Sequence, residues 1–241
     1  GNRIAEPERH GRDLRIEGVT ITGAAGWVVH PTQCQRIWIT GITLRNPMTG
    51  PNTDGLDING CSDVFIRDCH IETGDDGICF KTEPGSAPCQ RITISNCVIA
   101  SRTCAIKFGT GSYADFRQIT VENCVFYASD RGIGFHPYDG GTIEDVAFNN
   151  IVMQSQTTSP NYTERAISFD VRPRAADLRR AGASQTAGMI RNVTFSNMTF
   201  RGPCRVIIGA ETAFAVENLR FFNITHDITG SQDLAEFAEP S

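Results

Sequence analysis

The sequence predicts an all-β chain wound as a right-handed parallel β-helix of roughly eight coils. The first observation is a recurring alternating segment whose starts lie 27, 28, 27, 27, 47 and 26 residues apart. The second is a polar residue, usually Asn, that follows these segments, and the third is another series of short apolar-polar-apolar segments in the same phase. Alternation predicts half-buried strands, and a repeat of ~25 residues predicts coils that cover one another's apolar faces. The handedness follows from the general rule for parallel connections.

The two series of strands give the order of each predicted coil. The first series begins at Ile37, Val64, Ile92, Ile119, Val146, Val193 and Leu219. The polar position after it is held by Asp68, Asn96, Asn123, Asn150, Asn197 and Asn223. The second series begins at Val28, Leu56, Ile78, Ile106, Ile133, Ile167 and Val206. Gly, Asn, Asp and Pro between the strands are turn formers, and stacked Asn side chains are expected to form an amide ladder.

The repeat runs through the chain, so residues 1–241 are expected to form a single β-helix domain. The spacing widens to 47 residues after Val146, which predicts a long inserted loop at about 154–188.

Composition limits the classes of function. The formal net charge of -5 argues against a generally basic nucleic-acid-binding protein. No apolar run approaches the roughly 18 residues of a membrane span. We therefore expect no nucleic-acid or membrane partner, and we also expect a monomer.

Nine cysteines is a high and odd number, so at least one is unpaired within the chain. Six of them fall in two columns of the repeat: Cys34, Cys61 and Cys89, and then Cys69, Cys97 and Cys124. Buried thiols are the favoured interpretation, and one or two disulfides between adjacent coils are the alternative. No spacing matches a paired C-x-x-C zinc site, so no metal or cofactor is expected.

Two acidic turns are the candidate functional motif. Asn52-Thr53-Asp54-Gly55 and Gly74-Asp75-Asp76-Gly77 each precede a strand of the second series. Stacking would crowd Asp54, Asp75 and Asp76 onto one patch, where mutual repulsion costs stability and raises the pKa of a carboxyl group. A carboxylic acid beside a carboxylate suits hydrolysis of a glycosidic bond. A single Asp-Gly turn would indicate only a turn former, but two in adjacent coils favour chemistry.

Basic side chains are expected beside these carboxylates. Lys81, Lys107, Arg131 and His136 occupy outward or turn positions of the same series, where they could bind an anionic sugar, and Asn52 is a further candidate substrate-binding residue. Three of them also have a plain structural interpretation: Lys107 as a solvated strand residue, His136 as a rim residue and Arg131 as an ion-pair partner.

The chain resembles glycoside hydrolase family 28, the polygalacturonase-like enzymes. The resemblance rests on Trp27–Pro31, Gly50–Asp57 and Thr73–Lys81, with a further match at Asp130–Ile133 and Gly140-Gly141, and it extends over about residues 14–225. It implies a right-handed parallel β-helix that acts on pectin-type or related polysaccharides, normally with inversion at the anomeric carbon. By motif match, Asp75 is the general acid, and Asp54 and Asp76 position the water.

Two motifs of the family are missing. Arg102-Thr103-Cys104-Ala105 stands where Gly-His-Gly is usual, and Gly134-Phe135-His136 replaces the Arg-Ile-Lys that grips a substrate carboxylate. We hypothesise that Lys107 replaces part of the lost charge and that His136 replaces the lost histidine.

The leading hypothesis is a secreted or periplasmic glycoside hydrolase that acts on a plant or microbial polysaccharide, with specificity shifted away from plain polygalacturonate. The chain opens on Gly1-Asn2-Arg3-Ile4, so no signal peptide is expected within it, and this is uninformative about where the protein acts. A β-helix that binds sugars without cleaving them, and a polysaccharide lyase or epimerase, are the alternatives.

Overall fold

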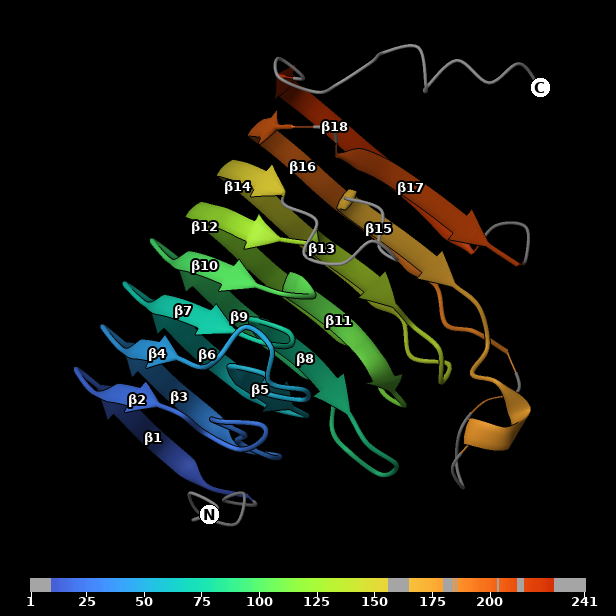
Figure 1. The fold of residues 1–241 in the computed structure, drawn as a ribbon. Helices are drawn as coiled ribbons and strands as arrows, with labels where there is room; N and C mark the ends of the chain where they lie inside the picture. Colours follow the sequence, from blue (N-terminus) through green and yellow to red (C-terminus); the bar gives the residue numbers. More distant parts are fainter. Residues whose placement is uncertain are drawn as a thin grey trace.

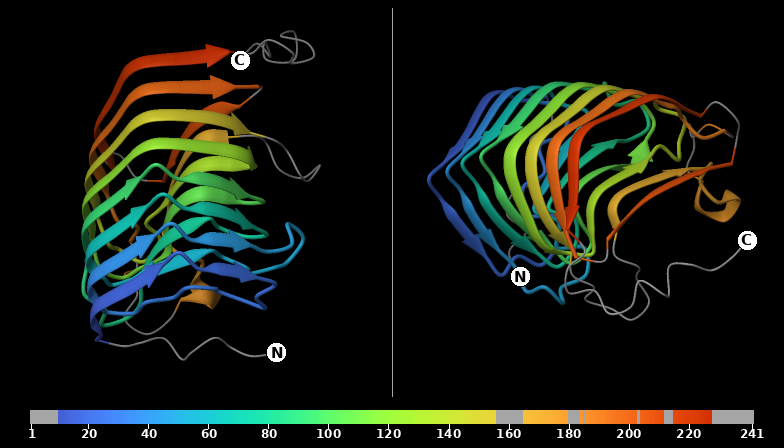
Figure 2. Two further views of the ribbon diagram at one scale, coloured as in Figure 1. Left: turned by 90° about the vertical axis from the view of Figure 1, so that its left-hand side faces the viewer. Right: turned by 90° about the horizontal axis from the view of Figure 1, so that it is seen from above.

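The computed structural model describes residues 10–155, 165–179, 184, 186–202, 204–211 and 215–227. These residues form a parallel β-solenoid, which confirms the predicted β-helix (Figure 1). Eight strands stack on one face, so the chain completes about seven turns between the first and the last. Figure 2 shows the coils layered along one axis.

The strands form a twelve-stranded sheet that bends round a corner, and a six-stranded sheet that carries the acidic turns. Before the bend, the large sheet contains β1 (Arg12–Glu17), β3 (Gln35–Thr40), β6 (Ser62–Arg67) and β9 (Cys89–Ser95). After the bend it contains β2 (Thr20–Thr22), β4 (Thr43–Arg45), β7 (His70–Thr73) and β10 (Val98–Ser101). Four long strands continue through the bend: β12 (Phe116–Ser129), β14 (Ile143–Ser155), β16 (Ile190–Arg201) and β18 (Val216–Asp227).

The six-stranded sheet stacks in strict sequence order. Its members are β5 (Leu56–Asn59), β8 (Ile78–Thr82), β11 (Cys104–Ser112), β13 (Arg131–His136), β15 (Arg165–Val171) and β17 (Arg205–Ala210). All of its pairings are parallel, so side chains at matching positions form columns along the solenoid.

The bend in the large sheet is made by the polar residues that the repeat singles out. Asn96, Asn123 and Asn150 have φ near +55°, a left-handed conformation that Asn tolerates better than most residues. The predicted amide ladder is confirmed, because Asn150 Nδ2 donates to Asn123 Oδ1 at 2.9 Å. Across the widened spacing the ladder shifts by one residue, and Asn197 Nδ2 donates to Asn149 Oδ1.

The core is built from stacked columns of Ile, Val and Phe. The rings of Phe80, Phe108, Phe135 and Phe169 follow one another with centroids 4.9, 5.0 and 4.7 Å apart. All nine cysteines are buried thiols outside any disulfide, so the interpretation as buried thiols is confirmed and the disulfide alternative is wrong. In this part of the fold, Cys acts as a small apolar side chain.

The predicted insertion at 154–188 contains β15 and a short 3-10 helix, η1 (Ala176–Leu178). Residues 156–164, 180–183 and 185 of this segment lie outside the described residues. After β15, Arg174 pairs with Asp139 at 2.6 Å and donates to Thr110 O, which ties the segment to the coils beneath it. Among the described residues, no helix is long and apolar enough to cross a membrane.

Candidate active site

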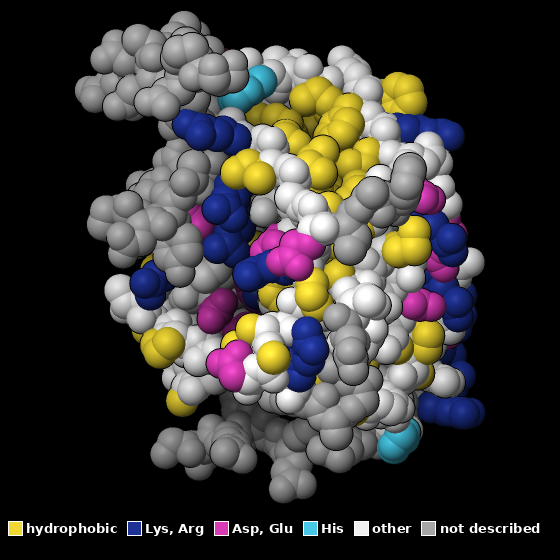
Figure 3. Space-filling view, turned by 90° about the vertical axis from the view of Figure 1, so that its right-hand side faces the viewer, with side chains coloured by type: hydrophobic (Ala, Val, Ile, Leu, Met, Phe, Trp, Pro, Cys, Tyr) yellow, Lys and Arg dark blue, Asp and Glu magenta, His cyan; other side chains and the backbone are white. Residues whose placement is uncertain are grey.

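The acidic turns lie in one column at the start of the six-stranded sheet. Since Leu56 pairs with Ile78, Asp54 lies in register with Asp76. The same register continues through Cys104, Arg131, Arg165 and Arg205. The column therefore changes from acidic to basic along the solenoid axis. Acidic and basic side chains lie next to one another near the middle of the face in Figure 3.

Glycine in both turns lets the coils approach closely. A Cβ on Gly55 would lie 2.5 Å from Gly77 O, and a Cβ on Gly77 would lie 2.6 Å from Ala105 O. Thr53 joins the two turns, because its hydroxyl donates to Gly50 O at 2.8 Å and accepts from Gly74 N at 3.1 Å. The glycine after each aspartate is thus required by the packing between coils as well as by the turn.

The predicted grouping of Asp54, Asp75 and Asp76 is present. One carboxylate oxygen from each lies within 4.8 Å of the others. Asp54 and Asp76 are only 2% and 1% exposed, whereas Asp75 is partly exposed. The three acids are therefore not equivalent, because Asp75 alone among them is partly accessible from outside.

The Asp75 carboxyl group is held by three contacts. Its Oδ2 accepts from the backbone N–H of Asn52 at 3.1 Å, its Oδ1 accepts from Asp76 N at 2.9 Å, and Thr103 Oγ1 lies 3.0 Å from the same Oδ1. These contacts fix the direction of the carboxyl group. They also show how Asn52 contributes: through its backbone, with φ at +51°.

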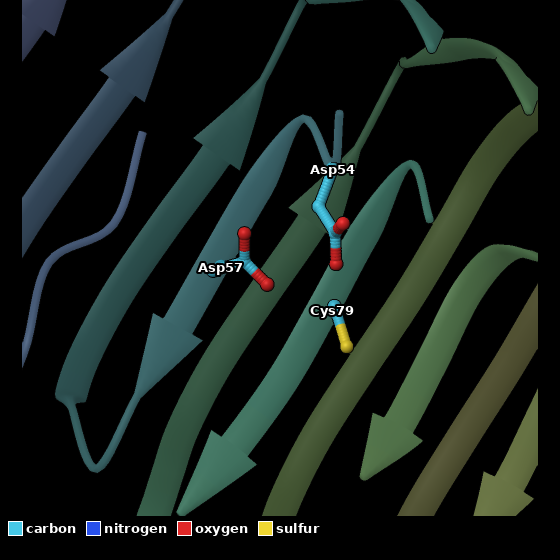
Figure 4. A group of neighbouring side chains, drawn as sticks. All are labelled: Asp54, Asp57 and Cys79. Atoms are coloured by element: carbon cyan, nitrogen blue, oxygen red, sulfur yellow. The ribbon is translucent and has the colours of Figure 1, made fainter. Parts of the chain in front are cut away.

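Asp54 shares an ammonium group with a fourth carboxyl group, that of Asp57. Lys81 Nζ lies 3.1 Å from Asp54 Oδ2 and 3.1 Å from Asp57 Oδ1, and all three side chains are largely buried. Burial raises the pKa of Asp54 against the opposing charge of Lys81, and the neighbouring Asp76 and Asp75 raise it further. Burial also raises the pKa of Asp57 well above its usual value. Figure 4 shows Asp54 and Asp57 beside the thiol of Cys79.

Asp76 is held in the charged form by its own ammonium partner. Burial opposes ionisation, but Lys107 Nζ at 2.7 Å from Oδ2 outweighs it, and Thr103 Oγ1 donates to Oδ1 at 2.6 Å. The pKa of Asp76 is therefore lowered. Lys107 lies beside the acids as predicted, although its contact is with Asp76 and not with open solvent.

Arg131 and His136 lie farther along the sheet. Arg131 Nη1 is 3.8 Å from Cys104 Sγ, and its Nε is 3.7 Å from Asp130. His136 is 5% exposed, and its Nδ1 lies 3.3 Å from the hydroxyl of Tyr138, which in turn donates to Asp170. Burial, together with Lys107 and Arg131, lowers the pKa of His136 to about 3, so its ring is neutral.

The outward residues of the strands fall into two columns. Lys107 is in register with Asp57's partner Cys79, whereas Lys81 is in register with Asn59. The two columns share the parity of outward side chains and differ in position along the strand: Asp57 and Lys107 follow the first residue of their segments directly, whereas Lys81 and His136 come two residues later.

Sequence reasoning missed Thr103 and Asp57 as parts of the site. Thr103 contacts both Asp75 and Asp76, and Asp57 contacts Lys81. The available signal for Thr103 was its position in the repeat. Thr53, Asp75 and Thr103 occupy the same place in successive coils, directly before the column of Asp54 and Asp76.

Two triplets of oxygen and sulfur atoms are close enough to be considered for a metal: Asp54, Asp57 and Cys79, and Asp54, Asp75 and Asp76. In both, an ammonium group already lies against a carboxylate, Lys81 against Asp54 and Asp57 and Lys107 against Asp76. These ammonium groups supply the positive charge that such acid clusters require.

Comparison with known proteins places the chain in a family. The family model described as "Glycosyl hydrolases family 28" matches residues 9–232. The chain belongs to this family. The match confirms the resemblance inferred from the motifs, and the family is one of glycosidases.

Individual relatives are polygalacturonases of plants. A probable polygalacturonase of Vitis vinifera is 29% identical over 152 residues, which cover 59% of this chain and 31% of the relative. An exopolygalacturonase of Platanus acerifolia is 24% identical over 225 residues, which cover 90% of this chain and 56% of the relative. The chain thus spans between about a third and just over half the length of these relatives.

Solved structures show the same fold. A hyperthermoactive exopolygalacturonase from Thermotoga maritima superposes with a TM-score of 0.71 at 22% identity, covering 92% of this chain and 54% of that one. An endo-xylogalacturonan hydrolase from Aspergillus tubingensis gives a TM-score of 0.65 at 14% identity, with 93% of this chain and 61% of that one covered.

Proposed function

We propose that this protein is a glycoside hydrolase that cleaves glycosidic bonds in a pectin-like polysaccharide. The observation that carries the proposal is the group formed by Asp54, Asp75 and Asp76, with oxygens within 4.8 Å of one another and only Asp75 open to a large substrate. Family membership and relatives named as polygalacturonases support the substrate class. A pectin substrate lies outside the cytoplasm, so we place the protein there, secreted or periplasmic and acting as a monomer.

The three acids have different catalytic roles in this proposal because they differ in solvent exposure. Asp75 reaches a glycosidic oxygen at the surface and donates a proton to it as the bond breaks. Asp54 and Asp76 are too buried to contact a sugar ring, but a water molecule is small enough to be held by both. Asp76 is ionised beside Lys107 and accepts the proton of that water as it attacks.

This division of roles gives inversion at the anomeric carbon. The stereochemistry needs to be measured, because the oxygens of the three acids lie within 4.8 Å of one another. The two carboxyl groups of inverting glycosidases are usually about 6.5–9.5 Å apart, and those of retaining glycosidases about 5–5.5 Å. The first anomer released can be followed by proton NMR before mutarotation. A product of retained configuration would assign Asp54 or Asp76 as a nucleophile and overturn the water-holding role.

We propose that the substrate is bound around the acids by Lys81, Lys107 and Arg131. The exposed Asn52 is proposed as a further substrate contact. His136 is proposed as a neutral partner for a sugar hydroxyl, because its lowered pKa excludes a charge clamp near neutral pH. This differs from the Arg-Ile-Lys of the family, and it suits a sugar that is not held through its carboxylate alone.

A digestion panel tests the proposed function. Homogalacturonan, methyl-esterified pectin, rhamnogalacturonan and a neutral galactan are incubated with the protein and with Asp75→Asn. We expect new reducing ends from one uronate-containing polymer and a loss of about 10²- to 10⁴-fold in the variant. Products that absorb in the ultraviolet would identify a lyase. Binding without cleavage would identify a carbohydrate-binding β-helix.

A further inference from the structure

Trp27 occupies the position of Asp54 in the preceding coil. Val28 N donates to Asp54 O at 3.0 Å, and Val29 bridges to Leu56, so Trp27 lies in register with Asp54. Side chains in one column of a parallel stack point the same way. The indole is therefore the next side chain along the acidic column, on the side of Asp54 away from Asp76.

The ring of Trp27 is held in place by the ammonium group that pairs with Asp54. Lys81 Nζ lies 4.1 Å from the ring centroid, in a cation–π contact. The ring also meets the His30 ring edge-on, with centroids 4.9 Å apart and planes at 89°. His30 Nε2 in turn lies 3.3 Å from both Thr32 Oγ1 and Asn59 Nδ2. Trp27 is thus oriented by neighbours on two sides.

Despite these contacts, Trp27 remains 40% exposed. The other tryptophan of the chain, Trp38, is packed between Arg15 at 4.3 Å and Phe65 at 5.9 Å, far from the acids in the register of the coils. Packing accounts for Trp38. It does not account for a fixed indole surface left open beside buried carboxylates, because the exposed part of the ring gains no free energy from burial.

The indole of Trp27 lies close to the acids. Lys81 Nζ is 4.1 Å from the indole centroid and 3.1 Å from Asp54 Oδ2, so the centroid and that oxygen are at most 7.2 Å apart. At the other end of the column lie Arg131, Arg165 and Arg205. A polysaccharide lying along the column would meet an aromatic surface on one side of the acids and guanidinium groups on the other.

We propose that Trp27 is a sugar-binding platform, on which the C–H face of the sugar residue next to the cleaved bond stacks. An aromatic face attracts polarised C–H groups and offers no positive charge of its own. The platform therefore takes a sugar by its apolar face, whether its carboxyl group is free, esterified or absent. This inference rests on the proposed function, since it assigns one binding position of the same site.

Fluorescence tests the platform directly. The chain has two tryptophans, so Trp38→Phe leaves Trp27 as the single indole and preserves the aromatic stack with Phe65. In a Trp38→Phe, Asp75→Asn protein, titration with oligogalacturonides of one to six residues is expected to change the emission of Trp27 in a saturable way. Trp38→Phe alone serves as the control and should hydrolyse like the wild type.

Kinetics give the second measurement. We expect Trp27→Ala to raise KM about three- to tenfold for long oligosaccharides, with kcat nearly unchanged and the effect lost on the shortest substrate. Trp27→Phe, which keeps an aromatic face, should recover part of the affinity. A Trp27→Ala protein with unchanged KM and a shifted pH profile of kcat/KM would mean that Trp27 only holds Lys81, and the platform would be rejected.

The two proposals fail in distinguishable ways. Saturable emission change with no hydrolysis of any polymer would overturn the hydrolase and leave the platform standing. Hydrolysis with no response of Trp27 to any oligosaccharide would overturn the platform and leave the hydrolase standing.

Discussion

Lys107 reaches across one coil to Asp76, with Nζ 2.7 Å from Oδ2, and the pair is largely buried. Removing either charge alone would leave the other unpaired in a medium where desolvation is costly. This pair keeps Asp76 ionised although it is 1% exposed. The ionised carboxylate is what the proposed activation of water requires.

Lys107→Met is expected to move the acidic limb of kcat/KM upward by about one pH unit or more. Without the ammonium, burial raises the pKa of Asp76, so a higher pH is needed to ionise the base. Lys107→Arg keeps the charge and is the matched control, with a limb near that of the wild type. The pH profile of each variant gives the result, and an unmoved limb in Lys107→Met would remove Asp76 from the role of base.

Asp75→Asn should lose little activity on a substrate whose leaving group needs no proton. General acid catalysis contributes about 10²- to 10⁴-fold for a sugar leaving group. For a nitrophenyl glycoside of the same sugar, the phenolate leaves unassisted, so the wild type and the variant should differ much less. The ratio of kcat values on the two substrates measures this. Equal losses on both would show that Asp75 is not the acid.

The coil repeat, the amide corner and the grouping of the acids could all be predicted, because each depends on a spacing that recurs in the sequence. Contacts that depend on side-chain direction could not. His136 turns back over Gly134, where a Cβ would lie only 2.8 Å from Nε2, so the ring follows a space left by a neighbouring glycine. Thr103 binds two acids from an adjacent coil, which no local motif encodes.

His136 should make the protein sensitive to acid. Its pKa is about 3 in the folded chain and about 6.5 when unfolded. Below pH 6.5 the unfolded chain binds a proton that the folded chain does not, so stability falls by about 1.4 kcal/mol per pH unit until the folded pKa is reached. Denaturant unfolding of the wild type and His136→Gln between pH 4 and 7.5 checks this. As the pH falls, the unfolding free energy of the wild type should decrease more than that of His136→Gln. A difference between the two proteins that stays constant with pH would refute the prediction.

Asp57 should oppose stability as the pH rises. Burial raises the pKa of this carboxyl group well above its unfolded value of about 3.9, with Lys81 acting against the rise and Asp54 adding to it. The sign follows from proton binding: the folded chain holds a proton that the unfolded chain releases. Its contribution to stability is therefore complete below the unfolded pKa and is lost as the pH rises through the folded pKa. Asp57→Asn has nearly the same shape and cannot ionise, so its unfolding free energy relative to the wild type should increase from pH 4 toward neutrality.

Asp63→Asn is the control, because Asp63 pairs with Arg91 at the surface, where such pairs contribute about 0–1 kcal/mol. If Asp57→Asn instead loses stability relative to the wild type as the pH rises, Asp57 is ionised in the fold and acts as a second counter-ion of Lys81.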